Sequence, residues 1–171
     1  MRTLHNIDLK NNESGFTLRW QDRLILSHST DEPCLWIGAG VADIEMFRGN
    51  FSIKDKLNEK IALTDATVSQ QSAGWAIRFT RGDAVSATLL VGVDAEGRLE
   101  LKLKNDAPGH NRIWLRLAAQ PEDHIYGCGE QFSYFDLRGK PFPLWTSEQG
   151  VGRNKQSHVT WLADCKENAG G

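Results

Sequence analysis

The stretch GWAIRFTRGDAVSATLLVGVDAEGRLELKLKN (residues 74–105) holds three segments separated by two turns. In the first and last segments apolar residues recur at every second position: Trp75, Ile77 and Phe79, then Leu99, Leu101 and Leu103. This period of two is typical of strands that bury one face. Arg81-Gly82-Asp83 and the DAEG sequence at 94–97 supply residues that turns favour. The stretch therefore predicts an antiparallel meander.

The flanking sequence continues this pattern. GFTLRWQDRLILSHS (residues 15–29) reads as a hairpin, PCLWIGAG (33–40) as a short apolar strand closed by glycines, and NRIWLRLAA (111–119) as a further strand. Short strands with turns between them predict an all-β fold, an antiparallel sandwich. The expected core residues are Leu18, Trp20, Leu24, Leu26, Ile77, Phe79, Leu89, Leu99, Leu101, Ile113, Leu115 and Leu117.

One segment is ambiguous. FSIKDKLNEKIAL (residues 51–63) spaces Ile53, Leu57 and Ile61 four apart, which suits a helix, yet its apolar residues also fall on alternate positions. We favour a strand.

Composition limits the function. The 171 residues carry a net charge of -2, so no nucleic-acid partner is expected, and no apolar run reaches the length of a membrane span. The N-terminus has no signal-peptide core. The three cysteines match no zinc motif, and we interpret them as reduced thiols of a cytoplasmic protein. No metal or cofactor is expected.

The chemistry is concentrated in residues 127–155, an irregular and aromatic segment. Glu130 follows two glycines, where a carboxylate could hold the loop or contact a ligand. Asp136, Arg138 and Lys140 occupy alternate positions, so an extended strand would place them on one face, as an ion-paired edge or as substrate contacts. Both readings stay open for these residues.

Trp145 and Glu148 form a second candidate pair. An aromatic ring beside a carboxylate suits a sugar, because the ring stacks on its apolar face and the carboxylate accepts from its hydroxyls. From Arg138 to Lys155 four cations accompany Glu148, which favours an anionic substrate or a solvated rim. The five histidines are scattered, and most are expected at the surface.

YGCGEQFSYFDLRGKPFPLW (residues 126–145) resembles the N-terminal domain of glycoside hydrolase family 31. The matching positions are Gly127, Gly129 and Glu130, then Asp136 to Lys140, then Leu144, Trp145 and Glu148. The resemblance spans nearly the whole chain. Within the family it points to the bacterial members that hydrolyse α-sulfoquinovosides.

The resemblance implies a galactose-mutarotase-like β-sandwich over residues 1–171. It implies that residues 127–155 form a loop of the substrate pocket and that 156–171 begin the link to a TIM barrel. In this family the barrel carries the two catalytic aspartates of a retaining α-glycosidase. No catalytic residue is therefore expected in this chain, which by itself would be inactive. The residues expected to bind substrate are Glu148, Trp145, Arg138, Lys140 and Glu130.

Two other functions compete with this one. A free-standing carbohydrate-binding module would explain the aromatic loop without any catalytic pair. A mutarotase-like epimerase would need a histidine and a glutamate converging on one concave face, for which His124 and Glu130 are the neighbouring candidates. The partners expected under the first function are a sugar glycoside and the protein's own barrel.

Overall fold

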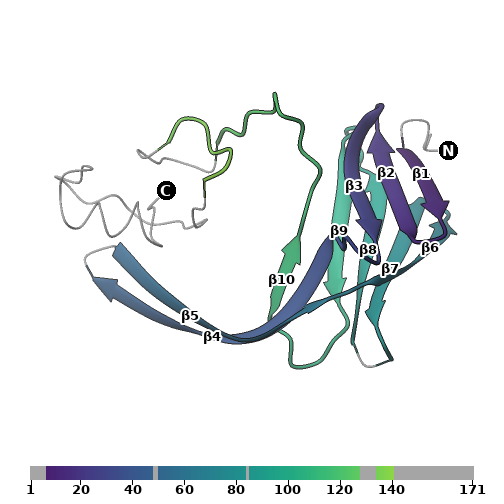
Figure 1. Ribbon diagram of the computed structural model, residues 1–171. Coiled ribbons are helices and arrows are strands. Elements are labelled where there is room, and N and C mark those ends of the chain that lie inside the picture. Colours follow the sequence, from purple (N-terminus) through teal and green to yellow (C-terminus); the bar gives the residue numbers. More distant parts are fainter. Residues whose placement is uncertain (1–6, 48–49, 84, 128–133, 141–171) are drawn as a thin grey trace. The chain divides into compact units, whose positions relative to one another are not determined.

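The structure is a computed structural model that describes residues 7–47, 50–83, 85–127 and 134–140. Across these residues the chain forms ten strands and no helix. Figure 1 labels the strands in chain order. The strands are β1 (Ile7–Asn12), β2 (Gly15–Trp20), β3 (Arg23–Ser29), β4 (Leu35–Phe47), β5 (Asn50–Ala62), β6 (Asp65–Gln71), β7 (Gly74–Arg81), β8 (Val85–Val93), β9 (Leu99–Asn105) and β10 (Arg112–Leu115). The all-β prediction is confirmed.

The strands form three sheets with the orders β1-β2-β3, β6-β7-β8-β9 and β10-β4-β5. The meander predicted for residues 74–105 is β7, β8 and β9, paired antiparallel throughout. Its register places Ile77 opposite Leu89, and Leu89 opposite Leu103, so the apolar residues share one face. The ambiguous segment 51–63 falls largely within β5, as favoured from its alternation.

The core lies between the β1–β3 sheet and the β6–β9 sheet, which face each other in Figure 1. Phe16, on β2, meets Phe79, on β7, with ring centroids 5.8 Å apart. The third sheet adds buried side chains of β4 to the same cluster. The fully buried residues include Phe16, Leu18, Leu26, Leu35, Ile37, Leu63, Ile77, Phe79 and Leu89.

His28 lies inside this core, only 2% exposed, which corrects the expectation of surface histidines in its case. Its ring stacks on Phe16 at 5.5 Å and meets the edge of Phe79 at 5.2 Å. Nε2 lies 3.2 Å from the carbonyl oxygen of Thr64, which can only accept, so Nε2 carries the proton. Nδ1 then accepts from the Cys34 backbone N–H at 3.3 Å.

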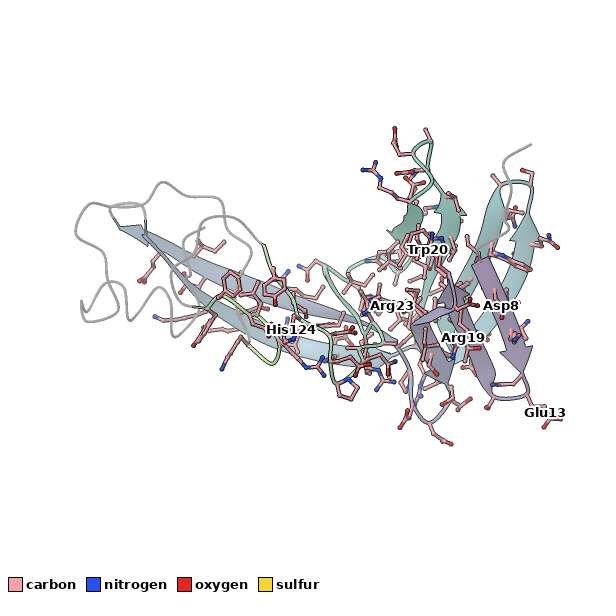
Figure 2. The ribbon with its side chains drawn as sticks, turned by 90° about the horizontal axis from the view of Figure 1, so that it is seen from above. Asp8, Glu13, Arg19, Trp20, Arg23 and His124 are labelled. Carbon is pink, nitrogen blue, oxygen red and sulfur yellow. The ribbon has the colours of Figure 1, made fainter. Side chains whose placement is uncertain are left out.

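The β2–β3 hairpin turns through Gln21 and Asp22, which have φ angles of 50° and 65°. Two left-handed residues in a two-residue loop match the right-handed twist of the strands. The Arg19 guanidinium donates to the Asp22 carbonyl across the turn; Figure 2 shows Arg19 and Arg23 on this hairpin.

Two members of the predicted core are displaced by this hairpin. The register shifts between Leu18 and Arg19, so that Leu18 pairs with Leu26 but Arg19 pairs with Leu24. The bulge turns Leu24 to the face of the exposed Arg19, and Leu24 stands outside the core cluster. Trp20, the last residue of β2, is likewise half-buried and outside it.

Ile113 and Leu117 were also predicted in the core, and both are exposed, by 40% and 54%. Ile113 lies on β10, an edge strand with a neighbour on only one side. Leu117 lies beyond the end of β10, where the chain leaves the sheet and the Ala118 N–H bonds the Ile25 carbonyl instead. Leu115 is partly buried against the core, as predicted.

β4 runs through its glycines, so the short strand predicted at 33–40 was too short. Gly38 is needed because a Cβ there would lie 2.4 Å from the Glu59 carbonyl oxygen and 2.9 Å from the Trp114 ring. At Gly40 the Asn111 side chain replaces a partner strand: its amide bonds both the N–H and the carbonyl of Gly40 at 3.0 Å.

The chain divides into two compact units, residues 1–40 with 57–119, and residues 41–56 with 120–171. The first unit holds the core cluster. Within the described ranges no helix is long and apolar enough to cross a membrane.

We predict that the free energy of unfolding falls as the pH drops below 6.5. Burial lowers the pKa of His28 from its usual 6.5. The imidazole of His28 therefore binds a proton near pH 6.5 in the unfolded chain but only at lower pH in the folded chain. Below pH 6.5 this difference lowers the free energy of unfolding by up to about 1.4 kcal/mol per pH unit. Urea unfolding at pH 7.5, 6.5 and 5.5 measures this.

The variant His28→Phe is the comparison. It keeps an aromatic ring but removes the titrating group, so its pH dependence should be flatter. At pH 7.5 it should be less stable by about 1–3 kcal/mol, because Cys34 N–H and Thr64 C=O lose their partner. An equal pH dependence in both proteins would contradict the assignment.

Candidate functional site

Of the predicted pocket loop, residues 127–155, the structure describes residue 127 and residues 134–140. Glu130, Trp145 and Glu148 lie outside the described residues. Arg138 and Lys140 lie within them, together with the preceding segment 120–127. All of these belong to the second unit.

Asp136 joins the two described segments. Its Oδ1 accepts from the backbone N–H groups of Ile125 at 3.1 Å and Arg138 at 3.0 Å. Its Oδ2 lies 2.6 Å from Nδ1 of His124. The Leu137 N–H also bonds the Ile125 carbonyl at 2.8 Å, and the Leu137 side chain is 2% exposed. These bonds brace residues 134–138 against residues 124–125.

The extended strand predicted for Asp136, Arg138 and Lys140 is wrong. Residues 135–139 bend and turn, with Gly139 at a φ of 66° and a bond from Lys140 N–H to the Leu137 carbonyl at 3.0 Å. The carboxylate of Asp136 satisfies backbone donors here, so the local turn outcompetes a strand. The three side chains consequently do not share one strand face, so the ion-paired strand edge, one of the two alternatives left open for them, does not form.

Arg138 uses its guanidinium inside the protein. Nη1 donates to the carbonyl of Gln120 and, at 2.9 Å, to that of Asp123. Lys140 places Nζ 5.0 Å from the ring centroid of Tyr134. The structure therefore gives Arg138 a bracing role, while the Lys140 ammonium stays exposed on an aromatic ring.

The environment of Asp136 holds its pKa low, at about 2. The main cause is the hydrogen bond from His124, followed by the backbone N–H groups of Arg138 and Ile125. Asp136 is therefore ionised at any pH where the protein would work, and it keeps a charge beside His124. Its contribution to the brace is lost only as the pH falls through about 2.

Aromatic side chains lie on the surface of this braced segment. His124 stacks on Tyr126 at 5.9 Å, and Tyr126 lies 5.1 Å from Phe135. Tyr126 is 56% exposed and Phe135 is 88% exposed. Figure 2 shows His124 on the segment that follows β10. A braced loop with exposed rings is suited to contact another surface or a sugar.

The sequence predicted an aromatic, functional loop but missed the pair of His124 and Asp136. The two residues are twelve positions apart, and neither forms a motif with the other. His124 pairs with Asp136. Glu130, the other residue proposed for an epimerase site, lies outside the described residues. Among the described side chains, no group of histidine, cysteine and acidic residues could hold a metal ion. Cys34 is a free thiol whose pKa burial raises to about 11.

The fold and this loop define an all-β sandwich domain that carries a braced, aromatic surface segment. Residues 8–157 match the family described as the glycosyl hydrolase 31 N-terminal galactose mutarotase-like domain. This match covers most of the chain, so the chain belongs to that domain family.

The chain is similar to two proteins named sulfoquinovosidase. The chain is 76% identical over 160 residues to a sulfoquinovosidase of Escherichia coli (strain K12), covering 94% of this chain and 24% of that protein. It is 42% identical over 166 residues to a sulfoquinovosidase of Agrobacterium fabrum (strain C58 / ATCC 33970), covering 93% and 23%.

A solved structure is also similar. It is a family 31 sulfoquinovosidase from E. rectale in complex with the aza-sugar inhibitor IFGSQ, at 38% identity and a TM-score of 0.71. The match covers 96% of this chain and 24% of that chain. The chain thus spans about a quarter of the length of the relatives it matches.

We predict that Asp136→Ala loosens the brace. The Asp136 carboxylate accepts from the backbone N–H groups of Ile125 and Arg138, and alanine offers no acceptor. Both amides should therefore exchange with solvent faster in the variant than in the wild type, measured by hydrogen exchange. Glu122→Ala, at an exposed residue of the same segment, is the control and should leave both amides unchanged. Unchanged exchange in Asp136→Ala would remove Asp136 from the brace.

Proposed function

We propose that this chain is the non-catalytic N-terminal domain of a retaining α-glycosidase that hydrolyses α-sulfoquinovosides. In this proposal the sandwich presents residues 127–155 to the active site of a barrel in a longer protein. The relatives named above support the substrate, since both are sulfoquinovosidases and span four times this length. We place the protein in the cytoplasm, on the reading of its cysteines as reduced thiols.

The observation that carries the proposal is the braced base of the loop. Hydrogen bonds of Asp136 and Arg138 fix segments 120–126 and 134–140 to one another on both sides of the Gly-Cys-Gly-Glu sequence. A site that positions substrate needs such support, because groups must be held within a fraction of an ångström. Two charged side chains, Asp136 and Arg138, bond backbone groups in this brace. This use of charged groups suits a loop that binds a ligand.

The site residues keep distinct roles in this proposal. Glu148 accepts hydrogen bonds from sugar hydroxyls, and Trp145 anchors the loop. Glu130 is either a ligand contact or an acceptor for loop amides. Arg138 acts by positioning, since its guanidinium is bonded to backbone carbonyls. Lys140 is exposed beside the Tyr134 ring, where an anionic substrate could approach it.

A free-standing carbohydrate-binding module is the second candidate. The exposed rings of Tyr126 and Phe135 favour it, because such a module needs an aromatic surface and no catalytic pair. The two functions differ in whether sugar binding requires the remainder of the longer protein.

We predict that the 171-residue chain alone releases no aglycone from a chromogenic α-sulfoquinovoside. A retaining mechanism needs two carboxylates about 5 Å apart across one glycosidic bond. In this proposal both carboxylates belong to the barrel of the longer protein. Release that rises in proportion to the concentration of purified chain, above a buffer blank, would refute the non-catalytic role.

We predict that Glu148→Gln in the longer enzyme lowers kcat/KM by roughly ten- to a hundredfold. A charged acceptor contributes about 1.5–3 kcal/mol, and that loss would appear in the transition state. The melting temperature should not change. Steady-state kinetics with an α-sulfoquinovoside measures the effect.

Glu122→Gln serves as the matched control, because it makes the same charge change at an exposed residue near the braced segment. It should keep wild-type kinetics. If Glu148→Gln behaves like this control, Glu148 is a surface residue and leaves the site.

A further inference from the structure

A second aromatic surface lies on the β10-β4-β5 sheet, within the first unit. Trp36 on β4 pairs directly with Trp114 on β10. Along β4 Trp36 alternates with the buried Leu35 and Ile37, so the two indoles point away from the core. Both are partly exposed. Core packing therefore does not account for two tryptophans at this position.

Gly38 shapes the surface beneath them. A Cβ at residue 38 would lie 2.9 Å from Cζ3 and 3.0 Å from Cη2 of Trp114. The Trp114 indole thus rests directly on the backbone of β4. One side of the ring system is held by the sheet, which fixes the ring without a covering side chain.

Two cations accompany the indoles. Nζ of Lys60 lies 4.6 Å from the ring centroid of Trp114 and 5.3 Å from that of Trp36. Cζ of Arg116 lies 5.8 Å from the Trp36 ring. Aromatic rings attract cations in this range and hold them in place.

Neither cation forms an ion pair with a carboxylate of the described part of the chain. The neighbouring acid Glu59 faces Nε2 of His110 at 3.3 Å instead. Arg116 donates to the backbone carbonyl of Glu32, at 3.1 Å. The surface therefore carries two positive charges beside two indoles, on a chain whose net charge is -2.

We propose that Trp36, Trp114, Lys60 and Arg116 form a binding site for an anionic saccharide, a sugar ring bearing a sulfonate or carboxylate. The indoles would contact the apolar face or edge of the ring, and the two cations would pair with the anionic group. Charge complementarity selects this ligand over a neutral sugar. A nucleic acid would need a wider basic surface. This inference does not depend on the proposed function of the loop.

The test is a titration of the 171-residue chain, followed by ligand-detected NMR, with three methyl α-glycosides: the sulfoquinovoside, the glucuronoside and the glucoside. The first two are anionic and the third is neutral. The anionic sugars should bind, and the glucoside at least about fivefold more weakly, since only it lacks the charge-assisted contacts. A sulfonate site would rank the sulfoquinovoside above the glucuronoside, and a general anion site would rank them equally; either outcome supports the proposal.

Variants locate the site. Lys60→Gln should weaken binding of the sulfoquinovoside by about fivefold or more and leave the sheet intact, because Lys60 is exposed. Trp114→Ala should abolish it, with circular dichroism as the check on folding. Lys102→Gln is the matched control: that lysine is exposed on β9 and pairs with Glu100 at 2.8 Å. Its binding should equal wild type.

Trp145→Ala separates this site from the loop. If Trp145→Ala abolishes binding while Lys60→Gln does not, the sugar binds at the loop and this proposal is overturned. If neither anionic sugar binds the wild-type chain, or the glucoside binds equally well, the proposal is also overturned. None of these outcomes changes the kinetics of Glu148→Gln, which test the proposed function alone.

Discussion

The three sheets of this domain meet at one buried imidazole. His28 comes from the β1–β3 sheet, stacks on Phe16 and touches Phe79 of the β6–β9 sheet. Its two nitrogens bond the Thr64 carbonyl, just before β6, and the Cys34 N–H, just before β4. A buried imidazole needs a hydrogen-bond partner for each ring nitrogen. Here the partners are backbone groups of Thr64 and Cys34, in the segments that lead into the other two sheets. His28 thereby ties the residues that precede β4 and β6 to the core.

Much of the fold could be predicted from alternation. The hairpin at 15–29 and the meander at 74–105 have one polar and one apolar face, and the sequence displays that period directly. The errors have local causes. Leu24 is turned outward by a bulge, and Ile113 lies on an edge strand. The alternation of apolar and polar residues in the sequence reveals neither a bulge nor an edge position. His28 was missed because its partners, Cys34 and Thr64, are set by tertiary packing.

The site was predicted less well. The aromatic and charged character of residues 127–155 indicated a functional loop, and the family resemblance assigned it to a glycosidase. Alternation then misplaced Asp136 and Arg138, whose side chains bond backbone groups from segment 120–125. Such bonds depend on which carbonyls and N–H groups come near, and a sequence does not show this. The same limit applies to Lys60, whose place over two indoles follows from strand pairing.

The central claim is that this sandwich lends its loop to the active site of a larger glycosidase. A crystal structure of the longer protein with a bound α-sulfoquinovoside or an aza-sugar analogue tests it most directly. The account predicts a Glu148 carboxylate oxygen within about 2.5–3.2 Å of a sugar hydroxyl, with Asp136 still bonded to His124 at the base of the loop. A Glu148 that faces solvent, with the sugar held by barrel residues alone, would contradict it.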